Sequence, residues 1–397
     1  MHAPARNVLS PLPKQRPSDP TRFVLNPSVW PELRFGTAAT EAYLQSPREG
    51  FYVKSPKSFL GARGVPPEIQ DRFTAFVTAM MRNLFEHATT FSGEAPQSIV
   101  IGRPVNFQGA DGDDDNRRAL NILEASARAG GFRDIAFLFE PMAAAMELES
   151  RQEREICVLV VDIGGGTTDC SFIRIGPSRR DKLDRTDDIL GHSGERIGGN
   201  DFDQLLAFHG IMPEFGLGLI RDSGLPVPNH LFMDAGSIND VNAQQRFYAE
   251  DTREQLERYT AEMSGERSCA RLLQLQEGRG TWRLVRTAEH VKVRLSDSSA
   301  TRANLGFVIP DLAIELTRET LRDSTTRLID HLRRLLHEVL AQGDRYPDLI
   351  YLTGGMARAH LTRACVVEVL PNLPLVDSDH FLSVTEGLTI RAGKLFG

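Results

Sequence analysis

Apolar and polar positions follow two different periods along the chain, and these periods separate predicted helices from predicted strands. Apolar residues recur at helical spacing over 67–91 and 318–341, which is typical of helices with one buried face. Short apolar runs at 157–161 and 349–352 predict buried strands. The same criteria predict strands at 98–101 and 136–139 and helices at 115–130 and 141–148. This β-α-β-α order favours an α/β layer structure.

A run of glycines and small polar residues follows the strand at 157–161. It contains, in order, Asp162, Gly164, Gly165, Gly166, Thr167, Thr168 and Asp169. Alternation resumes at 168–173, which predicts a strand, a tight turn and a second strand. Consecutive glycines permit positive φ and bring bare N–H groups within reach of an anion, and the threonine hydroxyls can add donors. The run therefore predicts a phosphate-binding hairpin. A glycine hairpin without a ligand is the alternative, and the flanking carboxylates and hydroxyls argue against it.

The strand at 349–352 also runs into glycines, through Thr353 to Gly354 and Gly355. A strand that ends in a glycine loop thus occurs twice in the chain. Two such units indicate a duplicated fold whose halves share a ligand.

The pattern of apolar and polar residues differs in two other parts of the chain. The first 31 residues contain seven prolines among polar residues, which predicts a disordered or loosely laid arm over 1–31. After Asp203, residues 213–239 are rich in loop formers and 243–263 read as one charged helix. A small inserted subdomain is therefore expected at about 205–290.

Composition and charge limit the function classes. With 397 residues, 41% hydrophobic content and 25% charged residues, the chain can fill two cores of ordinary size. Its net charge of −7 gives no basic surface for nucleic acid. The four cysteines lack any Cys-x-x-Cys pair, so neither a disulfide framework nor a zinc site is expected, and the plain interpretation is a cytoplasmic protein. No apolar run reaches the length of a membrane span or a signal peptide.

The glycine run resembles the second phosphate loop of the actin-like ATPase superfamily, in the form found in DnaK-type heat-shock chaperones. The wider chain is similar to the YegD-type relatives of DnaK. The matching stretches are 51–61, 101–109, 139–145, 191–203 and 351–355. The resemblance implies an actin-like fold with two lobes around a nucleotide cleft, the lobes covering 32–155 and 156–397. It also implies binding of ATP or ADP with Mg²⁺.

The resemblance assigns catalytic and metal-binding roles residue by residue. Lys57 matches the catalytic lysine that neutralises the transferred phosphoryl group, while Lys54 is the alternative choice. Glu140 matches the carboxylate that helps to hold metal and attacking water, or is a common first-turn acid. Asp162 and Asp169 match carboxylates that support Mg²⁺ through water, although Asp169 can instead bond across the hairpin. Thr167 is counted with the catalytic residues.

The resemblance also assigns nucleotide contacts. Gly198 and Gly199 admit the nucleotide where a helix begins. Glu289 and Lys292 lie three apart on one predicted helical face and can reach a ribose and an adenine, or form a surface ion pair. Gly354, Gly355 and Arg358 match the loop near the adenine and α-phosphate. Pro104 matches a proline that relays the nucleotide state, with a strand-end proline as the equal alternative. Val293 and Met356 stand where the family often has arginine and serine.

The first phosphate loop of the family is missing from this sequence. Arg34-Phe35-Gly36-Thr37 imitates its Asp-x-Gly-Thr form, but an arginine replaces the carboxylate and Pro31 interrupts the approach. We therefore expect an N-terminally truncated first lobe. Because this loop supplies donors to the β- and γ-phosphates, we expect weak or absent hydrolysis.

Three functions remain open from the sequence. The first is an ATP-binding, DnaK-like chaperone-type protein with a slow ATPase. The second is a non-catalytic nucleotide-sensing or interaction protein. The third, less favoured, is a small-molecule kinase of the same fold. No peptide-binding β-sandwich is recognised before Gly397, so a chaperone role is expected to need a partner protein.

Overall fold

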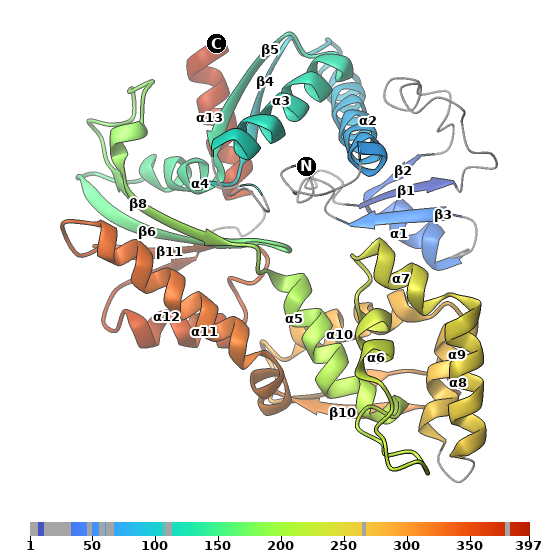
Figure 1. Ribbon diagram of the computed structural model, residues 1–397. Helices are drawn as coiled ribbons and strands as arrows, with labels where there is room; N and C mark the ends of the chain where they lie inside the picture. Colours follow the sequence, from blue (N-terminus) through green and yellow to red (C-terminus); the bar gives the residue numbers. More distant parts are fainter. Residues whose placement is uncertain are drawn as a thin grey trace. The chain divides into compact units, whose positions relative to one another are not determined.

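The protein has a mixed α/β architecture in the computed structural model (Figure 1). The structure describes residues 7–11, 33–45, 50–54, 60, 67–105, 107, 113–263, 267–377 and 382–397. The chain divides into two compact units: the first comprises Met1–Gly198, Leu332–Ala357 and Val366–Gly397, and the second Gly199–His331 and Arg358–Cys365. These bounds differ from the lobes expected at 32–155 and 156–397, which stay a prediction.

A five-stranded mixed sheet forms the centre of the first unit. Its strand order is β12-β11-β6-β7-β8, with β6 at Ile156–Ile163, β7 at Thr168–Ile175, β8 at Ile189–Glu195, β11 at Leu349–Thr353 and β12 at Leu375–Asp377. Strand β6 pairs with β11 in parallel and with β7 antiparallel. Its first six residues are buried, as a strand covered on both faces requires. The predicted strand, turn and strand around Asp162 are thus confirmed.

Two helices pack closely together beside this sheet. Helix α4 (Glu140–Glu149) is buried from Pro141 to its end, and α13 (Ser383–Phe396) lies against it. The approach is so close that any side chain at Gly387 would overlap the carbonyl of Ala143. Short side chains on both helices permit this contact of backbone with backbone.

The rest of the first unit contains a smaller helix-covered sheet. Strands β4 (Ser98–Arg103) and β5 (Asp134–Phe139) pair in parallel, and helices α2 (Pro67–Ser92) and α3 (Asp113–Gly130) pack on each other. A hydrogen bond of 3.1 Å from Thr78 to Ser126 joins the two helices. These four elements were predicted and are confirmed.

The N-terminal residues that the structure describes form a three-stranded antiparallel sheet in the order β2-β1-β3. The strands are β1 (Asn7–Pro11), β2 (Arg34–Phe35) and β3 (Gly50–Lys54), and helix α1 (Gly36–Gln45) follows β2. The expectation of disorder is therefore wrong for Asn7–Pro11, because β2 and β3 supply ladder partners that composition cannot reveal. The Arg34–Thr37 segment is a junction of strand and helix, with φ of 60° at Gly36.

The second unit is mostly helical. Its elements are α5 (Gly199–Leu206), a π-helical turn (Ala207–Ile211), α6 (Asn229–Gly236), α7 (Val241–Phe247), α8 (Glu250–Glu262), α9 (Ser268–Glu277), α10 (Thr281–Arg294) and the antiparallel pair β9 (Ala300–Asn304) and β10 (Ala313–Thr317). Helix α11 (Arg318–Gln342) contributes to both units, and α12 (His360–Val369) follows β11. Within the described ranges, no helix is long and apolar enough to cross a bilayer.

The single charged helix expected at 243–263 is wrong, because the structure has two helices there. Helix α7 begins at an Asp240 cap, whose side chain accepts from the N–H groups of Asn242 and Ala243. The break lies at Tyr248, whose hydroxyl is 2.7 Å from that of Thr281. This tertiary contact holds the tyrosine between the helices, and charge pattern alone does not predict it.

Candidate functional site

The glycine turn between β6 and β7 is closed by its own backbone. The N–H of Gly164 donates to the carbonyl of Thr167 over 2.9 Å. Asp162 and Asp169 are direct partners in the β6–β7 ladder, so their side chains lie on one face of the hairpin. The turn thus presents a half-exposed glycine backbone beside two neighbouring carboxylates.

A second glycine segment lies against this turn. A Cβ at Gly198 would come within 2.6 Å of the nitrogen of Gly166, so only glycine fits there. The hydroxyl of Thr168 donates to the carbonyl of Ile197 over 2.6 Å and holds the segment in place. Because a hydroxyl has one proton, this one is not available to a ligand in the arrangement seen. The expected hydroxyl donor at Thr168 is therefore occupied, whereas Thr167 is half-buried.

A third glycine segment reaches the same strand end from β11. Gly354 has φ of +84°, and a side chain there would overlap the Asp162 carboxylate and the Ile163 carbonyl. The N–H of Met356 donates to that carbonyl over 3.1 Å. Three segments that are far apart in the sequence therefore meet at the end of β6, and we call Gly164–Gly166, Gly198 and Gly354 the glycine cluster.

The two carboxylates of the hairpin each pack against a glycine. Asp162 lies against Gly354, and a Cβ at Gly194 would stand 2.8 Å from Oδ1 of Asp169. Among the described residues, no three His, Cys, Asp or Glu side chains gather closely enough to hold a metal ion. Two carboxylates suit Mg²⁺, which keeps much of its water and takes phosphate oxygens as further ligands. The residues present therefore fit a water-mediated Mg²⁺ site.

Glu140 is the first residue of α4 and is half-buried. It lies over β4, because a Cβ at Gly102 would come within 3.2 Å of its Oε1. Its position in the first turn suits an acid near a helix N-terminus. Both interpretations of Glu140 from the sequence remain compatible with this placement.

Arg103 is a residue that sequence reasoning passed over. Its guanidinium donates to the carbonyls of Pro104 (3.2 Å) and Val105 (3.1 Å) and stacks 4.5 Å from the ring centre of Phe139. Burial lowers the pKa of Arg103 from its ordinary value. The side chain therefore fixes the turn at Pro104 against the residue that precedes Glu140.

In the second unit, Lys292 has partners that the sequence did not indicate. Its Nζ lies 2.7 Å from Oδ1 of Asp203 and donates to the carbonyl of Gly199 over 2.9 Å. The side chain of Lys292 is 8% exposed and that of Asp203 is 2% exposed. The surface ion pair with Glu289 is thus wrong for Lys292, whereas Glu289 itself is half-buried.

The remaining predicted residues differ in their exposure. Gly355 and Arg358 are exposed, Val293 is 59% exposed, and Met356 is buried. Lys57 lies outside the described residues, and Lys54 is the last residue of β3. All four cysteines are buried thiols.

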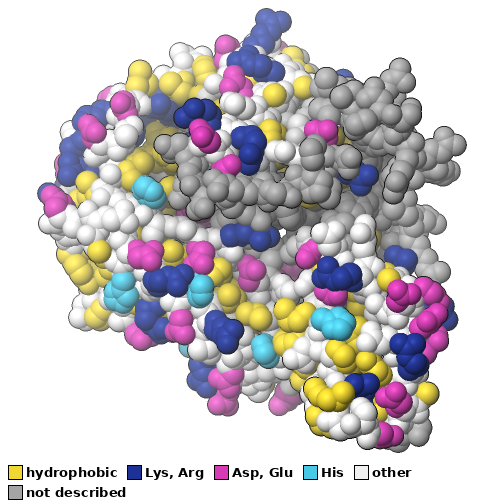
Figure 2. Space-filling view, in the orientation of Figure 1, with side chains coloured by type: hydrophobic (Ala, Val, Ile, Leu, Met, Phe, Trp, Pro, Cys, Tyr) yellow, Lys and Arg dark blue, Asp and Glu magenta, His cyan; other side chains and the backbone are white. Residues whose placement is uncertain are grey.

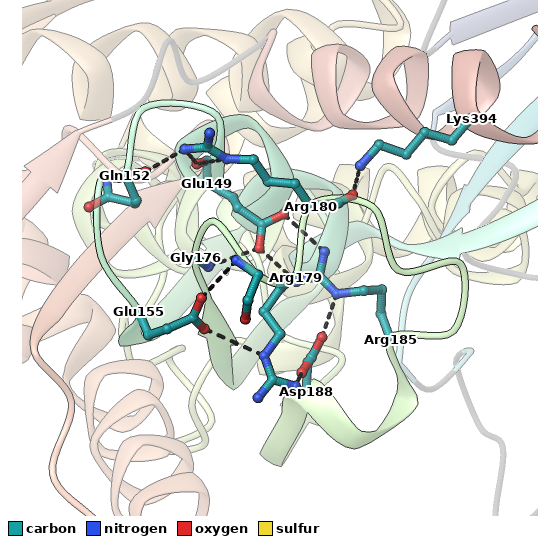
Figure 3. A network of polar contacts seen from close by, with 10 residues as sticks. Glu149, Gln152, Glu155, Gly176, Arg179, Arg180, Arg185, Asp188 and Lys394 are labelled. Carbon is teal, nitrogen blue, oxygen red and sulfur yellow. Dashed lines mark hydrogen bonds and ion pairs between the residues drawn. The ribbon is translucent and has the colours of Figure 1, made fainter.

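A buried polar network joins the C-terminal end of α4 to the loop between β7 and β8 (Figure 3). Arg185 makes two bonds of 2.9 Å to the Glu149 carboxylate and one of 2.5 Å to Asp188. Asp188 also accepts from Arg179 over 2.8 Å. Burial works to lower the pKa of Arg185, but the hydrogen bonds and charges of Glu149 and Asp188 outweigh it and raise that pKa. Figure 3 also shows Lys394 reaching the backbone of Arg180. No spacing motif links these positions.

Comparisons with known proteins found one matching family model and several similar chains. A family model described as MreB/Mbl protein matches residues 69–207, a range that includes the glycine turn. The chain is 25% identical over 392 residues to the chaperone protein dnaK3 of Thermosynechococcus vestitus, covering 94% of this chain and 47% of that protein. It is 24% identical over 330 residues to the chaperone protein dnaK of Emiliania huxleyi, covering 80% and 42%. The chain thus spans less than half the length of these relatives.

These similarities support the actin-like ATPase superfamily and a DnaK-like, nucleotide-binding type of protein. Together with the mixed α/β architecture, they confirm the predicted fold class. The YegD-type assignment and the missing first phosphate loop stay predictions.

Proposed function

Because the comparisons support the actin-like ATPase superfamily, we propose that this chain binds an adenine nucleotide with Mg²⁺ at the glycine cluster. The observation that carries this proposal is the meeting of Gly164–Gly166, Gly198 and Gly354 at the end of β6. Glycine is required at Gly198 and Gly354 by close backbone contact, and bare backbone N–H groups suit phosphate oxygens. The ligand class follows from this combination of N–H donors and carboxylates.

The proposal gives each residue of the hairpin a task. Asp162 and Asp169 hold Mg²⁺ through water, and the backbone of 164–168 with the Thr167 hydroxyl donates to the phosphates. Glu140 orients an attacking water, and Lys57 neutralises charge on the phosphoryl group. Bound Mg²⁺ would supply charge neutralisation at the phosphates. The family resemblance assigns nucleoside contacts to Gly199, Glu289, Gly355 and Arg358, and we propose each of these residues as such a contact.

We propose that hydrolysis is weak or absent in the 397-residue chain. The printed sequence has no Asp-x-Gly-Thr segment before Lys57, and loss of one preorganised donor costs roughly 2.7–4 kcal/mol of barrier. The segments that resemble chaperones are nucleotide-binding segments, so the nucleotide-binding step is the part of a chaperone-type role that we propose for this chain. A nucleotide-sensing protein is the second candidate, and a small-molecule kinase the third.

On the described face that Figure 2 shows, no feature favours nucleic acid as a partner. Basic and acidic side chains are interspersed over the visible described face (Figure 2), and the net charge is −7. Continuous basic surfaces are what attract nucleic acid. We therefore propose a nucleotide and not a nucleic acid as the ligand. Other proteins are proposed as partners and, from the cysteine pattern, a cytoplasmic location is proposed.

The test is isothermal titration of the folded chain with Mg·ATP. Asp162→Asn keeps the shape of the side chain and removes its charge, and Asp222→Asn is a matched control on an exposed loop of the second unit. We expect binding by the wild type and the control and at least about tenfold weaker binding by Asp162→Asn, or about 1.4 kcal/mol. A folded wild type that binds no nucleotide contradicts the proposal. Phosphate release by the binding-competent protein then separates a slow ATPase from a sensor.

A further inference from the structure

We propose that Lys292 is a positioning residue, which sets nucleotide affinity through the first turn of α5 and does not contact the nucleotide. The inference rests on the proposed nucleotide binding. It differs from the role that the resemblance assigned to Lys292, which was direct contact with the nucleoside.

The geometry of Lys292 shows what it holds. Its ammonium lies 2.7 Å from Asp203 and 2.9 Å from the carbonyl of Gly199. Gly199 and Asp203 are one helical turn apart in α5, so a single ammonium from α10 binds the first turn of α5 at two points. One ammonium donor is thereby used on the Gly199 carbonyl, and the positive charge is paired with the Asp203 carboxylate inside the protein.

Burial makes this arrangement hard to exchange for a ligand contact. The side chains of Lys292 and Asp203 are 8% and 2% exposed. A lysine that turned to a nucleotide would leave the Asp203 carboxylate buried without that cation, which is strongly unfavourable. The neighbouring Arg294, by contrast, is exposed on the same helix.

The first turn of α5 matters because of the residue before it. Gly199 directly follows Gly198, where a Cβ would come within 2.6 Å of the Gly166 nitrogen. The bond to the Gly199 carbonyl holds the Gly199–Asn200 peptide, and Gly199 is the residue to which Gly198 is directly bonded. Lys292 thus acts on one member of the glycine cluster through the covalent chain.

A paired-replacement experiment separates positioning from contact. The variants are Lys292→Met, Asp203→Leu and the double variant Lys292→Met/Asp203→Leu, in which two apolar side chains replace the buried pair. Arg294→Met is the matched control, because it removes an exposed cation two residues away on α10. Each protein is titrated with Mg·ADP, which avoids turnover, and its melting temperature is measured.

If Lys292 positions α5, each single variant loses affinity by about 5- to 150-fold, the usual range of coupling between sites. Both singles also melt at a lower temperature, and the double variant regains affinity and melting temperature together. Arg294→Met behaves as the wild type.

A direct contact gives a different pattern. In that case the double variant binds as weakly as Lys292→Met even when its melting temperature recovers, and this result overturns the inference while the proposed function stands. Absence of Mg·ADP binding by the folded wild type overturns the proposed function, and the inference with it.

Discussion

Two groups of acidic side chains in the first unit have opposite surroundings. Glu149 and Asp188 face cations supplied by the chain itself, Arg185 and Arg179. Asp162 and Asp169 are direct partners in the β6–β7 ladder, and each packs against a glycine. The first arrangement balances charge internally and braces a helix end. The second places two negative charges beside bare backbone, which suits a metal ion and a phosphate. The neighbours of these carboxylates therefore distinguish a structural ion pair from a candidate binding site.

The largest effect on stability is expected from removal of Arg185, the cation that pairs with Glu149 and Asp188. Arg185→Met leaves Glu149 and Asp188 without their bidentate partner, and we expect the free energy of unfolding to fall by about 3–5 kcal/mol. Urea denaturation measures the loss. Arg82→Met is the control, because its pair with Glu86 is exposed and is worth at most about 1 kcal/mol. Equal losses in the free energy of unfolding would show that the Arg185 ion pairs do not stabilise the fold more than an exposed pair does.

A substitution in the glycine cluster should reduce stability less than Arg185→Met does, but it should reduce nucleotide binding more. Gly198→Ala places a methyl group against the Gly165–Gly166 peptide, and overpacking of this kind costs about 1–3 kcal/mol. We expect Mg·ATP affinity to fall more than tenfold, or about 1.4 kcal/mol, since the turn must move. Titration calorimetry on the folded variant checks this.

The control for that substitution is Gly393→Ala on α13, where a Cβ would meet nothing within 4 Å. It should stabilise the helix by up to about 1 kcal/mol and leave affinity unchanged. Unaltered nucleotide affinity in Gly198→Ala would remove the main support for the site.

The smallest expected effect is a pH dependence of stability, which comes from a histidine outside both groups of carboxylates. Partial burial and the nearby Arg327 lower the pKa of His209 in the π-helical turn. The unfolded chain then binds more protons, so stability is lost as pH falls below the unfolded value of about 6.5. We expect His209→Gln to flatten the decline in melting temperature between about pH 7 and 5. A profile identical to that of the wild type would assign the decline to other groups.

The sequence predicted the parts of the molecule that local patterns determine. The strand, glycine turn and strand around Asp162 are contiguous, and the long helices α2 and α11 carry their apolar stripes within one segment. Gly198 entered the candidate site only through the family resemblance, whereas Gly354 was also indicated by the repeated pattern of a strand that ends in glycines. The structure gave the physical reason for both glycines, which is close packing at the end of β6.

What the sequence did not predict depends on partners far along the chain. Lys292 pairs with Asp203 and Arg185 with Glu149, and neither spacing is a motif. Strand β1 exists through its ladder to β3, and the Thr168 hydroxyl is occupied by Ile197. Side-chain partners of this kind follow from the assembled fold, because hydrogen bonds and charges act between surfaces that only tertiary packing brings together.

The parallel pairing of β6 with β11 also sets an order of events during folding. Strands β6, β7 and β8 form a local meander, whereas the bond between Cys157 and Asp348 joins residues 191 positions apart. Contacts of such high sequence separation form slowly, because a long loop must close first. Gly354 reaches Asp162 only after that closure, so the glycine cluster is completed among the last steps. Nucleotide binding would then report that the long-range pairing of β6 with β11 in the first unit has formed.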